Sequence, residues 1–168
     1  TDAALNTVVT FADTVRPAVQ AFTSSTADGA YKNGESINIT ATMTETVLAG
    51  SKITVILGTA DKVELTTSTN STSLTGTYTV SALDNSADLA VSSFSLTDIS
   101  GAATTVTDVY GNFMQSTSMP GSQNLSDNKA IVVDNIPIAG GAVVATSLDP
   151  DDTIVLNFSE AVTNHAAL

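Results

Sequence analysis

The 168-residue sequence contains no cysteine, no tryptophan, one histidine and only five Lys or Arg residues. The absence of Cys excludes disulfides, thiol nucleophiles, thiolate zinc sites and iron–sulfur clusters. The few basic residues stand beside 17 Asp and Glu, which gives a formal net charge of −12. Such a surface repels phosphate backbones and anionic lipid headgroups. We therefore expect neither a nucleic-acid partner nor a peripheral membrane role.

Long hydrophobic runs are also missing, since no stretch approaches the roughly 20 apolar residues of a membrane span. No signal peptide opens the sequence. Either a leader has been cleaved or it lies far upstream on a larger precursor, and because residue 1 falls inside a repeat, we expect the second. Apolar residues still make up 42% of the chain, so a folded domain is expected rather than an acidic disordered tail.

Hydroxylated residues are abundant, with 27 Thr and 19 Ser. β-Branched Thr fits the outward face of a half-solvated strand. Apolar and polar residues alternate with period two, which indicates strands. The strands expected from this pattern, from an opening segment and from a closing apolar run cover residues 17–24, 37–43, 53–57, 63–66, 74–80, 89–96 and 130–133. A phase slip of one residue at Ser92 and Ser93 predicts a β-bulge.

Turn-forming residues separate these segments, and no segment carries a sustained helical stripe. About seven short strands of this kind predict an all-β fold, an antiparallel β-sandwich of the immunoglobulin type. Residues 97–128 are expected to form one or two long loops, with room for a short strand near 104–109. The side chains expected in the core are Ile37, Ile39, Met43, Val55, Leu74, Tyr78, Val91, Phe94 and Val132.

Parts of the sequence recur. Residues 13–17 reappear in outline as 134–137, and residues 39–47 reappear as 154–162, so the repeating unit is close to 120 residues long. We predict one complete module over 14–134, the end of a preceding repeat with its linker over 1–13, and a linker with the first strands of a following repeat over 135–168. Residues 1–12 and 142–168 are then strands that lack partners within this chain. Stacked arrays of modules serve reach or coverage rather than catalysis.

Five segments, 13–17, 24–35, 84–89, 108–112 and 127–134, resemble in this order the motifs of bacterial Ig-like tandem repeats of large cell-surface proteins. The Phe-Ser-Glu-Ala-Val strand motif of that family stands at 158–162 and, more weakly, at 43–47. The second linker, 135–141, departs from the pattern. The resemblance covers the central module and implies a secreted, non-enzymatic structural protein whose neighbours are further repeats or copies of itself. A surface glycan or host ligand would be bound elsewhere in the full protein.

Two host functions stay open. A surface-layer or sheath subunit would make lateral contacts in a lattice, whereas the stalk of a calcium-stiffened cell-adhesion protein would make end-to-end contacts only. A carbohydrate-binding module needs exposed aromatic side chains, and the chain has only five Phe and three Tyr. Catalysis is not expected either. His165 is the sole imidazole, and nothing in the sequence supplies the scaffold that a Ser–His–Asp triad needs.

Carboxylates are the candidate ligands, because Ca²⁺ prefers about six to eight oxygen atoms. Neither an EF-hand spacing nor a calcium-binding nonapeptide is present, so the argument comes from topology. In an Ig sandwich the start of the first strand, the loop after the second strand and the last interstrand loop share one pole. We therefore expect Asp13, Glu45 and the 98–112 region together beside the incoming linker. The candidate Ca²⁺ ligands are Asp13, Glu45, Asp108 and Asn112, with Asp134 and Glu160 as repeat-equivalents at the next junction.

Two metal-free interpretations compete with the calcium site. Asp and Asn side chains commonly cap their own turns and then need no cation. Arg16, the one cation near the incoming linker, could instead pair directly with Glu45. At the opposite pole the same topology gathers Asp28, Asp84 and Asn85, together with Asp88 and the outgoing Asp134.

Overall fold

The computed structural model describes residues 12–136, and within this range the chain consists of strands, loops and one short helix. In chain order the elements are β1 (Val19–Thr23), β2 (Gly29–Tyr31), β3 (Ser36–Val47), β4 (Lys52–Leu57), β5 (Lys62–Thr66), β6 (Ser71–Thr79), β7 (Val91–Ser95), α1 (Leu125–Asn128) and β8 (Ile131–Val133). The predicted all-β, antiparallel fold is confirmed.

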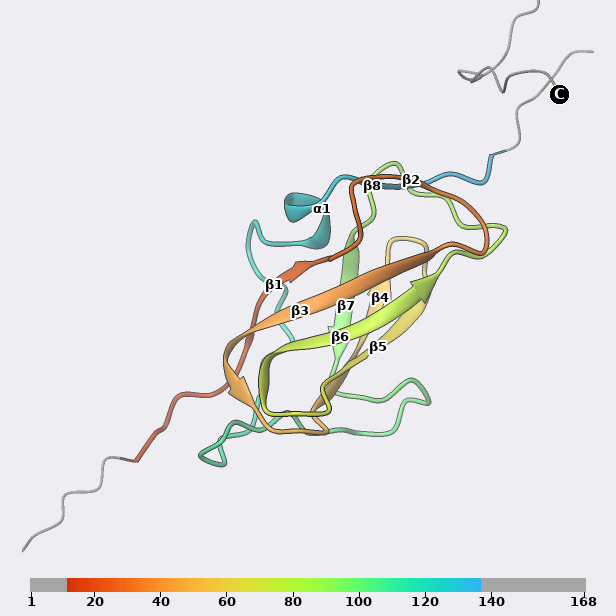
Figure 1. Cartoon of the computed structure of the whole chain (residues 1–168). Coiled ribbons are helices and arrows are strands. Elements are labelled where there is room, and N and C mark those ends of the chain that lie inside the picture. The colour runs from red at the N-terminus through yellow and green to blue at the C-terminus, as the bar shows by residue number, and fades with distance from the viewer. Residues whose placement is uncertain (1–11, 137–168) are drawn as a thin grey trace, which may run out of the picture. The chain divides into compact units, whose positions relative to one another are not determined.

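Six strands form one antiparallel sheet in the order β1-β3-β6-β5-β4-β7. Its two outermost strands nevertheless meet, because the rings of Phe22 in β1 and Phe94 in β7 pack edge to face with centroids 5.6 Å apart. The sheet therefore curls until its halves face each other across a shared core. Figure 1 shows this arrangement, with β4 and β7 lying behind β3 and β6.

The segment 123–128 joins the two edges of the curled sheet. At the β1 edge, the Phe22 amide donates to the Gln123 carbonyl and the Asn128 side chain donates to the Phe22 carbonyl, each at 2.9 Å. At the β7 edge, the Asn124 side chain accepts from the Val91 amide and donates to the Val91 carbonyl, also at 2.9 Å. Both edges are thus paired by this segment, which covers unpaired strand backbone.

The helix α1 is too short to leave a helical pattern in the sequence, and it was not predicted. Asn124 caps it, and Asp127 accepts a hydrogen bond from the Asn124 amide at 2.8 Å, which completes a capping box. Among residues 12–136, no helix is long and apolar enough to cross a membrane.

β2 and β8 form a separate parallel pair, with Gly29 opposite Ile131 and Tyr31 opposite Val133. The sequence predicted a turn where β2 begins and gave no sign of a parallel pair. The expected inward position of Val132 is also wrong, because Ile131 and Val133 are buried and Val132 is only half-buried. The run 130–133 is apolar at every position, so alternation could not decide which face points inward.

The remaining core expectations hold. Each of these side chains is buried: Ile37, Ile39, Met43, Val55, Leu74, Tyr78, Val91 and Phe94. The predicted bulge is present as well, since Ile56 pairs with Ser93 while the next residue, Leu57, pairs with Val91 and leaves Ser92 without a partner in the ladder.

One compact unit ends at Asn135. The strands expected over residues 1–11 and 142–168 lie outside the described residues, and so does the second copy of the strand motif at 154–162.

Candidate functional site at the incoming pole

The chain reaches β1 alongside two loops, and we call this end of the module the incoming pole (residues 13–17, 44–50 and 107–113). The Asn112 side chain donates to the Asp13 carbonyl at 3.2 Å, and the Arg16 guanidinium donates to the Phe113 carbonyl at 2.9 Å. A third bond runs from the Ala18 amide to the Thr44 hydroxyl at 3.0 Å. The segment before β1 is therefore hydrogen-bonded to the rest of the fold at several points.

The loop at 107–113 is built around Asp108, whose side chain is fully buried. One carboxylate oxygen accepts from the amides of Tyr110 and Asn112 at 2.8 Å, and the other accepts from the Asn112 side chain at 2.8 Å. Gly111 takes a positive φ of 94°, which closes the turn. Desolvation alone would raise the pKa of Asp108, but the hydrogen bonds from Asn112 and Tyr110 outweigh it and lower that pKa. Asp108 is thus held as a carboxylate.

Asp13, Glu45 and Asp108 form a cluster in which one carboxylate oxygen of each lies within 4.8 Å of the others. This is the proximity that topology predicted. Glu45 is half-buried in β3, and its Oε1 atom is enclosed and has no hydrogen-bond partner among residues 12–136. Burial raises the pKa of Glu45, and the charges of Asp108 and Asp13 raise it further.

The cluster therefore combines one carboxylate fixed in its charged form with another that resists ionisation. A shared proton or a divalent cation would relieve the repulsion. Arg16 does not do so, because its guanidinium binds the Phe113 carbonyl and no Arg16–Glu45 ion pair is present in the described part of the chain. The turn-capping interpretation holds for Asp108 and Asn112, and Asp13 also accepts from the Val15 amide at 2.9 Å.

The other predicted ligands lie elsewhere. Asp134 is at the opposite end, where its amide donates to the Tyr31 carbonyl at 2.9 Å. Glu160 lies outside the described residues.

We call that opposite end the outgoing pole (residues 31–35, 81–86, 134 and 135). Its centre is Asn135, whose side chain donates to the carbonyls of Ser81 and Asp84 at 3.0 and 2.8 Å and accepts from the Asn33 amide at 2.6 Å. The Asn135 amide also donates to the side chain of Asn85 at 2.9 Å. Asn135 is therefore hydrogen-bonded to both the 31–35 and the 81–86 segments of this pole.

Two predicted acidic residues near this pole have their own partners. Lys129 pairs with Asp28 at 2.9 Å, and this hydrogen bond lowers the pKa of Asp28. Asp84 is buried and accepts from the Tyr78 hydroxyl at 2.5 Å and from the Ser81 amide at 2.6 Å. Desolvation would raise the pKa of Asp84, but these hydrogen bonds prevail and lower it. Sequence reasoning missed the Tyr78–Asp84 pair, since Tyr78 fits the core pattern without it.

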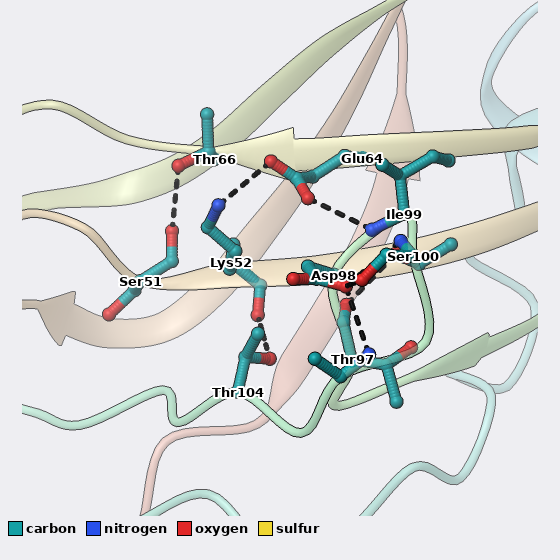
Figure 2. Close-up of polar contacts among 11 residues, drawn as sticks. Ser51, Lys52, Glu64, Thr66, Thr97, Asp98, Ile99, Ser100 and Thr104 are labelled. Carbon is teal, nitrogen blue, oxygen red and sulfur yellow. Dashed lines mark hydrogen bonds and ion pairs between the residues drawn. The ribbon is translucent and has the colours of Figure 1, made fainter.

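Asp98, which topology also directed toward the incoming pole, caps its own turn instead. Its carboxylate accepts from the Ser100 amide at 2.9 Å and the Ala102 amide at 3.0 Å. Figure 2 shows how this loop is attached to β4 and β5: Glu64 pairs with Lys52 at 3.0 Å and accepts from the Ile99 amide at 3.0 Å. These acidic groups stabilise a loop, and neither Asp98 nor Glu64 belongs to the carboxylate cluster.

No protein-family model, curated protein or solved structure matches this chain.

Proposed function

We propose that this chain is a non-enzymatic structural module of an extracellular surface-layer or sheath protein, whose repeated copies space and cover the cell surface. The observation that carries this proposal is the course of the chain, which enters at one pole and leaves at the other, with hydrogen bonds fastening both linkers. β3 runs between the two poles, and its 12 residues span about 36 Å. Such a module sets a fixed spacing between its two neighbours in an array.

The sequence supports the same proposal. Two segments recur at a spacing close to 120 residues, and the ordered motifs are similar to those of bacterial Ig-like repeats. The curled antiparallel sheet suits that family. A Ser- and Thr-rich, strongly acidic surface without Cys suits a position outside the cell, facing water and salt.

A second candidate is the stalk of a large cell-adhesion protein that calcium stiffens, and the carboxylate cluster favours it. The donors present fit Ca²⁺, because all are oxygen atoms and because Glu45 Oε1 is buried without a partner in the described chain. Asp13, Glu45 and Asp108 would hold the ion. When bound, the ion would neutralise the three carboxylates and tie the linker to β3 and to the 107–113 loop. Asp134 and Glu160 would be the equivalent ligands at the next junction.

Antibodies raised against this chain and applied to intact cells of the source organism test the proposal. We expect labelling of the cell surface without permeabilisation. Electron micrographs of the extracted material should then show ordered sheets for the coat, or filaments that soften in a chelator for the stalk. Labelling that requires permeabilisation would contradict both.

A further inference from the structure

Large apolar side chains gather on the surface of the incoming pole. The exposed fractions are 63% for Val15, 38% for Leu48, 45% for Val109, 73% for Tyr110 and 54% for Phe113. These five side chains come from the linker and both loops of the pole that also holds the carboxylate cluster. Several large exposed apolar side chains at one end of a fold mark an interaction surface.

The outgoing pole carries matching features. Leu83 projects into solvent with 91% of its surface exposed, on the 81–86 turn that binds Asn135. The same pole also has a shallow depression lined by Ala30, Tyr31, Lys32, Glu35 and Asp134. This pole thus offers the exposed apolar side chain of Leu83, a depression able to accept a side chain, and the exposed cation Lys32.

In a tandem array, the linker between consecutive copies would be too short to separate the outgoing pole of one copy from the incoming pole of the next. Asp134 is the repeat-equivalent of Asp13, so in a tandem array one aspartate occupies both positions. Its amide is bound to the Tyr31 carbonyl at 2.9 Å at the outgoing pole, and the Asp13 carbonyl is bound to Asn112 at 3.2 Å at the incoming pole. The amide and the carbonyl of a single residue are only a few ångströms apart. The Tyr31 carbonyl of one copy and the Asn112 side chain of the next copy would then lie within about 10 Å of each other.

We propose that the incoming pole of one copy of this module binds the outgoing pole of the preceding copy. Tyr110 and Phe113 pack against Leu83 and into the depression beside Tyr31, and Lys32 faces the carboxylate cluster. The inference rests on the proposed tandem arrangement and adds to it a direct, stiff junction. The partner surface is therefore a second copy of this module, which the chain holds at high effective concentration.

A duplicated chain tests this, made by inserting a second copy of residues 15–135 after Asn135 of the full sequence, so that both copies keep Asn135 at the outgoing pole and Asp134 takes the place of Asp13 in the second copy. The pair Tyr110→Ser and Phe113→Ser is placed either in the second copy, whose incoming pole faces a complete module, or in the first copy, which is the matched control. We expect the second-copy variant to lower the urea midpoint by about 0.5 M more than the control. Equal shifts in the two variants would overturn the proposal.

Thiol labelling provides a second measurement that does not depend on stability, because the chain has no Cys of its own. Leu83→Cys in the first copy should react with a maleimide on the order of tenfold more slowly than Leu83→Cys in the second copy. Equal rates would mean that solvent, rather than a second copy, covers the outgoing pole, and would overturn the proposal. Surface labelling of intact cells would be unaffected by that result, so failure of the junction and failure of the proposed function remain distinguishable.

Discussion

At the scale of single residues, two neighbouring carboxylates, the buried Asp108 and the half-buried Glu45, differ in their behaviour. Asp108 receives three short hydrogen bonds from its own turn, whereas one oxygen of Glu45 receives none in the described chain. The Asp-x-x-Gly-Asn spacing made the first of these predictable. The unpaired oxygen of Glu45 was not predictable, because it depends on which distant side chains come within hydrogen-bond distance. No local sequence pattern determines that.

Glu45→Gln should stabilise the metal-free protein at neutral pH. The folded-state pKa of Glu45 is raised, so its stabilising contribution is present below the ordinary pKa of 4.5 and is lost as the pH rises through the folded pKa. The neutral amide escapes this loss. Thermal melts in a chelator should therefore give a higher Tm for the variant at pH 7.5, and the difference should vanish below pH 4.5.

Calcium should stabilise the parent protein much more than the Glu45→Gln variant. If Ca²⁺ binds the cluster, a concentration of 100 times Kd stabilises the parent by about 2.7 kcal/mol, and the Glu45→Gln variant responds far less. Asp88→Asn, a change at an exposed carboxylate outside the cluster, is the control and should respond as the parent does. Titration calorimetry with no heat in any of the three would leave the shared proton as the explanation of the cluster.

At the scale of elements, strand existence and phase followed from alternation wherever polar residues separated the apolar ones, as in β3 and β6. The predicted inward position of Val132 was wrong because the run around it is apolar at every position. α1 escaped prediction because it is too short to leave a helical pattern. β2 and the parallel β2–β8 pair escaped it because each depends on partners far away in sequence. The Asn124 side chain also depends on a distant partner, because it pairs with the Val91 backbone where a neighbouring strand would otherwise pair.

Gly76→Ala should weaken the β5–β6 pairing. A Cβ at this position would overlap the Glu64 carbonyl oxygen and approach Leu65 Cδ2 to 2.9 Å. Because backbone blocks the space, we expect a loss of about 2 kcal/mol or more in unfolding free energy, measured by urea denaturation. Gly121→Ala is the control, since nothing lies within 4 Å of its Cβ position. Equal stability of the two variants would show that β5 and β6 are not packed as described.

Asn124→Ala should open the β7 edge. The change removes the helix cap and leaves the Val91 amide and carbonyl without their side-chain partner. Loss of a cap and of buried hydrogen bonds together should lower the unfolding free energy by about 2–3 kcal/mol. Hydrogen exchange of the Val91 amide should accelerate as well. Gln123→Ala keeps the backbone carbonyl that binds Phe22 and should leave both measurements unchanged.

At the scale of the whole molecule, the sequence predicted a module by its repeats and an all-β fold by its alternation. It also predicted which acidic residues share a pole, because strand order dictates which loops are neighbours. It could not predict that residues 13–17 and 134–135 are hydrogen-bonded to the rest of the fold, since Arg16–Phe113 and Asn135–Ser81 join residues far apart in the chain. Those bonds set the path of the chain into one pole and out of the other.

The central claim is that each module extends the protein along one axis, and small-angle X-ray scattering of the duplicated chain beside the parent tests it most directly. Because β3 spans the distance between the poles, the added module should increase the maximum dimension by about 36 Å and give a narrow, elongated distance distribution. An increase of less than half that amount would mean that the modules fold back side by side, which would contradict the proposed spacer.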